Sequence, residues 1–229
     1  MNLHYAELRN RIIKSLLVVL AIFIVLFIYA RPLYTFVARP ILSQLPANST
    51  MIATQVTAPF LIPLKLSFMC AILLGVPYII FQAWAFVAPG LYKHEKKKIL
   101  PTILASITLF YLGLIFAFKV ISPLALTFFT QQAPEGVQVM TDISHYLDFL
   151  MLLLLATGFG FQIPIITIGI VKLKIVSRET LIKKRPWIIV ATFTLGMLLT
   201  PPDVLSQVLL AVPMWLLFEV GILLTKVRQ

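Results

Sequence analysis

The stretch Pro59–Lys98, PFLIPLKLSFMCAILLGVPYIIFQAWAFVAPGLYKHEKKK, decides the fold of this chain. No charged residue occurs from Leu66 to Tyr92, and the basic cluster that follows contains one carboxylate, Glu95. An α-helix rises about 1.5 Å per residue and the hydrocarbon core of a bilayer is about 30 Å thick, so this run is long enough to cross a membrane. The lysines at its end favour the cytoplasmic side for that end.

The composition of the whole chain is that of an integral membrane protein. Its 229 residues are 60% hydrophobic and 12% charged, whereas soluble domains are about 25% charged. A formal net charge of +11 would suggest nucleic-acid binding in a soluble protein. Here the basic residues lie at the ends of apolar segments, so the charge indicates membrane topology instead. The single cysteine, Cys70, excludes an intrachain disulfide.

Six apolar segments predict an all-α membrane protein with six transmembrane helices in one domain, residues 1–229. The expected spans cover about residues 14–31, 63–87, 99–122, 145–171, 186–200 and 204–225. The fifth apolar run, Trp187–Leu199, reaches only about 20 Å as a helix. The fifth and sixth helices are therefore expected to be short and to form a hairpin that thins the membrane locally.

Three local features are predicted between the spans. The segment Arg31–Ile62 is expected to fold as short helices near the membrane surface, because it is too polar to span and too apolar to be a free tail. A kink is expected near Pro77. Asp142 or Ser144 is expected to cap the fourth span.

The distribution of Lys and Arg predicts that both termini are cytoplasmic. The N-terminal segment, the Lys93–Lys98 loop, the Lys172–Arg185 loop and the C-terminal tail together hold 15 of the 19 basic residues. This bias is the positive-inside pattern of membrane proteins.

No catalytic motif accompanies these spans. The patterns G-x-x-x-x-G-K-[ST], H-E-x-x-H and G-x-S-x-G are all missing, and the three histidines lie in three different polar segments. ATP hydrolysis and metalloprotease chemistry are therefore not expected. We expect a protein that is not an enzyme and has no cofactor or metal.

A few polar residues remain as candidates for function. Glu7 and Glu95, both on the predicted cytoplasmic side, would form an acidic receptor for a cationic ligand, because a carboxylate accepts a guanidinium bidentately. The alternative for Glu95 is a solvated loop residue paired with nearby lysines, worth at most about 1 kcal/mol.

Two further polar residues lie inside predicted spans. Glu219 would cost about 2.5 kcal/mol or more there unless it is paired, faces a polar cavity or snorkels towards the end of its helix. Gln162 is expected to face the bundle and make one interhelical hydrogen bond. Asp203 is expected to cap the sixth helix.

The order and content of these segments resemble one known family. The stretches that carry the resemblance are HYAELRNR (4–11), FLIPLKLSF (60–68), QAWAFVAPGLYKHEKK (82–97), QAPEGVQVMTDISHYLDF (132–149), KKRPWIIV (183–190) and GMLLTPPDVLSQVLLAVPMWLLFEVG (196–221). They resemble the TatC family, whose members are the receptor subunits of the twin-arginine protein translocase. The resemblance covers His4 to about Arg228.

The resemblance implies a curved bundle of six spans in the bacterial inner (cytoplasmic) membrane. It implies a receptor that binds twin-arginine signal peptides of folded cargo and nucleates a translocation complex driven by the proton motive force. The implied partners are single-span subunits of the TatA and TatB type, further copies of the chain itself and the lipid bilayer, with no nucleic acid.

The resemblance also implies roles for particular residues. The signal-peptide-binding residues would be Glu7, Arg9, Phe86, Lys93 and Glu95, and the outer-face residues Pro40 and Asp203. The family usually has a glutamate where this chain has Gln162. A hydrogen-bonding role at that position survives the change, whereas a role that needs charge does not.

Two other functions compete with the receptor. A secondary transporter for a small cation or organic solute would use Glu219 and helices broken at Pro77 and Pro164. It would show substrate-dependent flux in liposomes from this chain alone. A purely structural scaffold would tolerate the loss of both Glu7 and Glu95.

Overall fold

We describe a computed structural model of the chain, which covers residues 2–42, 51–87, 99–131, 140–199 and 204–226. The chain divides into two compact units, Met1–Ile107 with Val139–Leu147 and Thr108–Gln138 with Asp148–Gln229. Each unit is described by itself. The single domain over residues 1–229 and the curvature of the bundle stay predictions.

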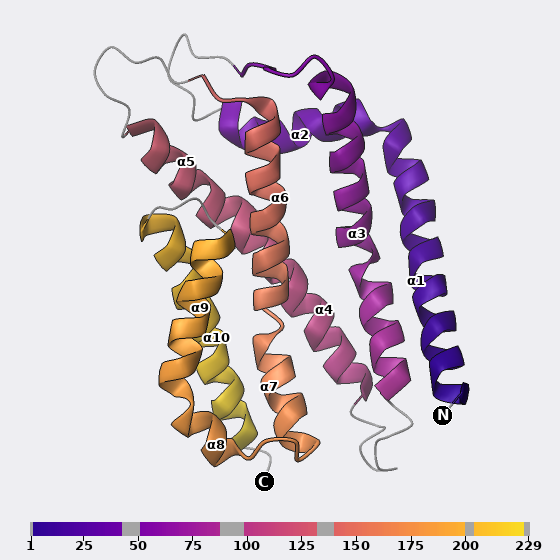
Figure 1. Cartoon of the computed structure of the whole chain (residues 1–229), viewed down its shortest axis with the longest axis vertical. Helices are drawn as coiled ribbons and strands as arrows, with labels where there is room; N and C mark the ends of the chain where they lie inside the picture. The colour runs from indigo at the N-terminus through magenta and orange to yellow at the C-terminus, as the bar shows by residue number, and fades with distance from the viewer. Residues whose placement is uncertain (1, 43–50, 88–98, 132–139, 200–203, 227–229) are drawn as a thin grey trace. The chain divides into compact units, whose positions relative to one another are not determined.

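The first unit is built on α1 (Asn2–Ile28) and α3 (Ala58–Val87), which pack side by side in opposite directions (Figure 1). Gly75 permits their close approach, because a Cβ at this position would lie 2.7 Å from Cγ2 of Val19. Between them in sequence, α2 (Ala30–Leu42) lies crosswise to both helices. The short helix expected within Arg31–Ile62 therefore forms.

The second unit begins in the last part of α4 (Ile99–Phe116), which continues through one π-helical turn (Ala117–Ile121) into α5 (Ser122–Gln131). The helices that follow are α6 (Ile143–Gly160), α7 (Ile163–Lys172), α8 (Arg178–Lys183), α9 (Arg185–Leu199) and α10 (Val204–Lys226). α10 packs against both α7 and α9. One buried cluster at the centre of this unit consists of Ala117, Ile121, Leu153, Ala156, Leu210 and Met214.

Prolines explain where two of the helices end. Pro32 has no N–H to donate to the carbonyl of Ile28, and α1 ends at that residue. In the same way Pro164 cannot bond the carbonyl of Gly160, and α6 ends there before α7 begins. A proline removes the hydrogen bond to the residue four positions earlier, and its ring clashes with that carbonyl. The predicted break at Pro164 is confirmed.

Other prolines lie inside helices without ending them. Pro63 and Pro77 are both inside α3, and Pro213 is inside α10. Membrane helices tolerate such positions because neighbouring groups satisfy the freed carbonyls. Pro77 therefore does not break α3, and the kink expected near it stays a prediction.

Five helical segments of the described residues are long and apolar enough to cross a membrane: Tyr5–Ile28, Ala58–Phe86, Leu100–Phe128, Ile143–Lys172 and Ser206–Thr225. A shorter apolar helix covers Arg185–Leu198. The all-helical, multi-pass architecture is thus as predicted. The count of six crossings and the cytoplasmic termini stay predictions.

One expectation about the spans is wrong. α9 is short, since its 15 residues rise about 22 Å, but α10 is not. It has 23 residues and rises about 35 Å, which exceeds the hydrocarbon thickness. α10 reaches this length because Pro213 does not interrupt it and because the charge of Glu219 is paired.

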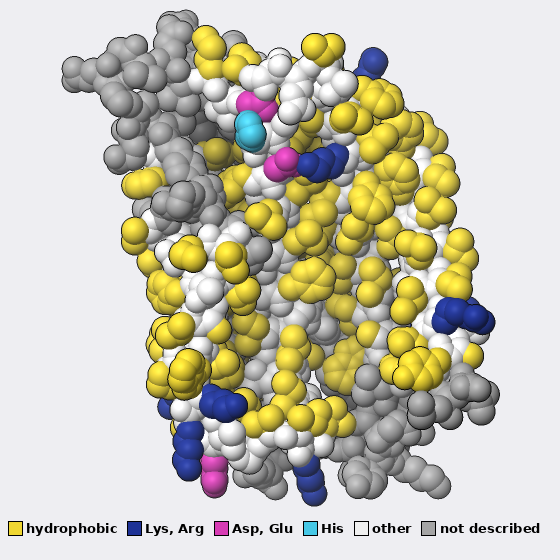
Figure 2. Space-filling model, in the orientation of Figure 1, with side chains coloured by type: hydrophobic (Ala, Val, Ile, Leu, Met, Phe, Trp, Pro, Cys, Tyr) yellow, Lys and Arg dark blue, Asp and Glu magenta, His cyan; other side chains and the backbone are white. Residues whose placement is uncertain are grey.

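The exposed surface of the helices is largely apolar (Figure 2). On α1, for example, Leu16 is 64% exposed and Ile28 is 73% exposed. Such a surface would be a liability in water, whereas lipid tails are as apolar as leucine and impose no cost on it. The exposed apolar side chains therefore agree with membrane-spanning helices.

Candidate functional site

A guanidinium group joins the first turns of α1 to the last turns of α3. Arg11 donates from Nε and Nη2 to Oε1 of Glu7, at 3.1 and 2.7 Å, and from Nη1 to Oε1 of Gln82 at 2.9 Å. Its Nη2 also donates to the carbonyl of Ala85 at 3.3 Å. Tyr78 completes the group, since Nε2 of Gln82 donates to its hydroxyl at 2.7 Å.

Arg11 pairs with the carboxylate of Glu7 and also donates to a backbone carbonyl at the end of α3. Ala85 lies in the last turn of α3, whose carbonyls have no partner within the helix. A cation near the C-terminus of a helix also interacts favourably with the helix dipole. Arg11 therefore fixes where the two helix ends meet, a role that the sequence analysis did not assign to it. Its spacing of four residues from Glu7 is the sequence signal that could have indicated their ion pair.

Glu7 keeps one oxygen open in this arrangement. Both hydrogen bonds from Arg11 go to Oε1, and among the described residues no contact to Oε2 is recorded. The Glu7 side chain is 37% exposed. The carboxylate is thus held in position by Arg11 and can accept a further donor through its second oxygen.

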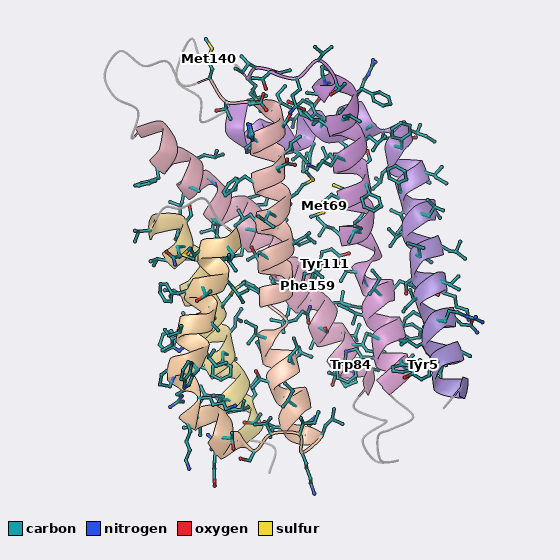
Figure 3. All side chains as sticks on the ribbon, in the orientation of Figure 1. Tyr5, Met69, Trp84, Tyr111, Met140 and Phe159 are labelled. Carbon is teal, nitrogen blue, oxygen red and sulfur yellow. The ribbon has the colours of Figure 1, made fainter. Side chains whose placement is uncertain are left out.

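An apolar groove of about 530 Å³ lies between α1 and α3, and Arg11, the partner of Glu7, is one of the residues that line it. Its lining includes Leu16, Val19, Phe68, Ile72, Ala83 and Phe86, with Arg11, Ser15 and Gln82 as its polar members. Tyr5 and Trp84 lie at the same end of the two helices as the Arg11 cluster (Figure 3), and aromatic residues are common where a span meets the membrane surface.

The structure covers only part of the predicted signal-peptide site. It brings Glu7 and Phe86 to the same end of the α1–α3 pair, and Arg9 is exposed one turn or less from Glu7. Lys93 and Glu95 lie outside the described residues. Their contacts with Glu7 therefore stay predictions.

Of the predicted outer-face residues, Asp203 also lies outside the described part. Pro40 is in α2, but its side chain is not described. Another acidic residue, Asp142, has a defined role: its Oδ1 accepts from the amides of Ser144 and His145, at 2.7 and 3.2 Å, and so caps α6. This confirms the predicted cap.

Asp142 also holds the segment that precedes α3. Its Oδ2 accepts from the hydroxyl and the amide of Thr54, at 2.6 and 2.9 Å, and Ile52 pairs with it as an isolated parallel bridge. The hydrogen bonds from Thr54, with those from the cap, hold the pKa of this carboxyl well below its usual range.

Glu219 is paired. Nη2 of Arg185, at the start of α9, donates to its Oε2 at 2.6 Å. The side chains are 42% exposed for Arg185 and 21% for Glu219. Pairing was one of the three possibilities for a carboxylate in a span, and the structure selects it over snorkelling.

Gln162 lies at the break between α6 and α7, and is half-buried. Its backbone amide donates to the carbonyl of Phe159 at 2.9 Å, and its own carbonyl accepts from Ile166 at 3.0 Å. The neutral side chain therefore sits where the helix is interrupted by Pro164. Among the described residues, no group of three His, Cys, Asp or Glu side chains has the arrangement of a metal site.

Comparison with known proteins matches the chain to one family model. The model describes the Sec-independent protein translocase protein TatC, and it matches residues 3–213. The chain belongs to the TatC family.

Curated relatives are similar in sequence to this chain over nearly its full length. The TatC protein of Escherichia coli strain K12 is 48% identical over 97% of this chain and 86% of its own length. The TatC protein of Haemophilus influenzae is 49% identical over 99% of this chain and 88% of its own length. All of the predicted site residues therefore fall within the matched lengths in this family.

Solved structures agree with the fold. A crystal structure of the twin-arginine translocase receptor TatC superposes with a TM-score of 0.86 at 33% identity, covering 98% of both chains. A second crystal structure of the same receptor, in a detergent, gives a TM-score of 0.87 at 32% identity. The TatC family is the receptor subunit of the twin-arginine translocase, and it is a non-enzymatic family of membrane proteins.

Family membership decides between the competing functions. The chain is a component of a protein translocase, and other translocase subunits are its partners. The small-solute transporter loses its main support, because the carboxylate of Glu219 is engaged by Arg185.

Proposed function

We propose that the ends of α1 and α3 that carry Glu7 and Phe86 form part of the binding site for twin-arginine signal peptides of folded cargo. The proposal is carried by two observations: among the described residues no contact to Oε2 of Glu7 is recorded, and Arg11, which holds the other oxygen of Glu7, lines the α1–α3 groove. A guanidinium group of the signal would meet the carboxylate, and the apolar segment that follows it would occupy the groove. Arg9 and Lys93 would flank the site and disfavour unspecific cations.

Glu95 is expected to supply the larger share of the attraction. The negative charge of Glu7 is already compensated by Arg11. The two guanidinium groups of a twin-arginine signal therefore need a second acid. A hydrogen bond between charged groups contributes about 1.5–3 kcal/mol. Losing one such contact should therefore weaken signal binding about tenfold or more.

Site-specific photo-crosslinking in membranes tests this proposal. A photoreactive residue at Ala83, which lines the groove, leaves both carboxylates intact, and Leu104 on α4, which is 57% exposed, serves as the control position. We expect a crosslink from position 83 to a signal peptide with Arg-Arg that weakens about tenfold with Lys-Lys.

Charge variants locate the acids. Glu95→Lys and Glu7→Gln should each reduce the crosslink, whereas Glu179→Lys, an exposed acid on α8, should leave it unchanged. Equal crosslinking of Arg-Arg and Lys-Lys peptides, or full crosslinking with Glu95→Lys, would contradict the proposal.

The proposed function also includes a location, partner subunits and a source of energy. We place the chain in the bacterial inner (cytoplasmic) membrane with this site on the cytoplasmic side, in line with the positive-inside bias. Single-span subunits of the TatA and TatB type would dock along the exposed apolar faces of α9 and α10, and further copies of the chain would join the complex. The proton motive force would drive the translocation step.

A further inference from the structure

A basic pocket at the other end of the chain is not used by the proposed signal-peptide site. It has a volume of about 440 Å³ and lies where α7, α8 and α10 meet. Three cations and two hydroxyls line it, together with apolar side chains that include Val171 and Leu224: the polar members are Lys172, Lys174, Arg178, Ser177 and Thr225. Among the described residues, no acid lines the pocket, and Glu179, the acid of α8, is exposed and is not part of the lining.

The position of the pocket relates it to the membrane. α7 and α10 both belong to apolar segments long enough to span, and these segments end at Lys172 and Thr225. The pocket is lined by residues at these two ends. It therefore opens where the hydrocarbon core gives way to the headgroup layer. Leu173 and Ile175 beside it are 46% and 67% exposed, as suits residues that face lipid.

The backbone holds Lys174 in a conformation that a lysine rarely adopts. Its φ is 54°, the left-handed region that favours glycine. The amide of Lys174 donates to the carbonyl of Val171 at 3.0 Å, and that of Ile175 donates to Ile170 at 3.1 Å. These two bonds end α7 in a Schellman motif, in which this position is usually glycine. Lys174 therefore lines the pocket from a position where the backbone conformation favours glycine.

Arg178 is held so that part of its guanidinium is available. Its Nε donates to the carbonyl of Ile222 on α10 at 3.4 Å. Among the described residues, its two Nη atoms have no recorded partner. One edge of the guanidinium is therefore fixed by α10, and the other can bind an oxyanion.

We propose that this pocket binds the phosphate of an anionic phospholipid, such as phosphatidylglycerol, from the leaflet that contacts the basic loops. Three cations around a cavity favour a phosphate, and the apolar wall on α7 and α10 continues into the hydrocarbon core, as an acyl chain requires. Basic pockets at the ends of membrane helices are suited to acidic headgroups. The proposal does not depend on the signal-peptide site.

Native mass spectrometry of the full chain, extracted from bilayers of known composition, tests the proposal. We expect phosphatidylglycerol to be retained over phosphatidylcholine. Lys174→Gln and Arg178→Gln should each weaken retention about fivefold, the effect of one basic residue near an anionic surface. Lys183→Gln, which removes an exposed charge from α8 outside the pocket, should have no effect.

A second variant separates binding from folding. Lys174→Gly relieves the left-handed backbone, so it should raise the melting temperature while it weakens phosphatidylglycerol retention as much as Lys174→Gln does. Equal retention of both lipids, wild-type retention by Lys174→Gln, or the same loss with Lys183→Gln would each overturn the proposal. Displacement of the lipid by glycerol phosphate at similar concentration would show a site for free phosphate esters and would also overturn it.

Discussion

Nη2 of Arg185 and Oε2 of Glu219 lie 2.6 Å apart and tie the first residue of α9 to the last third of α10. α9 is shorter than the five segments of the described residues that are long enough to cross a membrane. The ion pair attaches the start of α9 to α10, and this attachment does not require α9 to be long enough to span the membrane. The pair also removes the cost of leaving Glu219 charged and alone in a span.

We expect Glu219→Gln to destabilise the second unit by about 1–2 kcal/mol, between the values for exposed and buried ion pairs, because both side chains are partly exposed. The melting temperature in detergent measures this. A double-mutant cycle with Arg185→Gln should show coupling between the two residues. Additive effects of the two changes would mean that the pair contributes nothing.

Arg11→Lys tests the cluster that joins α1 and α3. A lysine keeps the charge but cannot contact Glu7, Gln82 and the Ala85 carbonyl together, because its ammonium is a single point of contact. We expect a loss of about 1.5–3 kcal/mol, the contribution of one hydrogen bond to a charged group. Lys14→Gln, an exposed residue of the same helix, is the control. An unchanged melting temperature for Arg11→Lys would show that the cluster does not hold the helices.

Gly113 tests the packing of α4 on α6. A Cβ there would lie 2.8 Å from the carbonyl oxygen of Thr157, a backbone atom that cannot rotate away. Gly113→Ala should therefore destabilise by about 1–3 kcal/mol, as overpacking does. Gly169 in α7 is the matched control, since a Cβ there meets nothing within 4 Å.

Gly169→Ala should instead stabilise by up to about 1 kcal/mol, because alanine is the better helix former. Thermal unfolding of the two variants under one condition compares them. The same sign of change for both would contradict the close contact at Gly113.

Asp142 predicts a dependence of stability on pH. The hydrogen bonds from Thr54 and from the α6 amides lower the pKa of its carboxyl in the folded state. The stabilisation from this group is therefore fully present above its unfolded pKa of about 4, and it is lost progressively as the pH falls below that value. Melting temperatures between pH 3 and pH 7 measure the effect.

Asp142→Asn should be less stable than the wild type at pH 7, and the difference should shrink towards pH 3. Thr54→Val should reproduce part of the loss, whereas Thr54→Ser, which keeps the hydroxyl, should not. A constant difference between wild type and Asp142→Asn over this range would show that the carboxylate charge is not what stabilises the contact.

Much of the fold could be read from the sequence, because hydrophobic length and the positions of proline act locally. The run from Leu66 to Tyr92 predicted the long helix α3, and Pro164 predicted the break between α6 and α7. The cap of α6 by Asp142 also followed from local sequence. The bounds expected for the sixth span, 204–225, also agree with α10, whereas the sequence did not identify Arg185, 34 positions away, as the partner of Glu219.

The candidate site also has some features that the sequence predicted and others that depend on contacts between helices. The charge distribution along the spans predicted that Glu7 lies on the cytoplasmic side, and the family resemblance singled out Phe86; both stay predictions. Only the tertiary structure decided that Arg11 binds Oε1 of Glu7, with no contact to Oε2 among the described residues, and that Lys174 lines a basic pocket from a left-handed backbone position. These features arise from contacts between helices and from backbone geometry, which spacing along the chain does not specify.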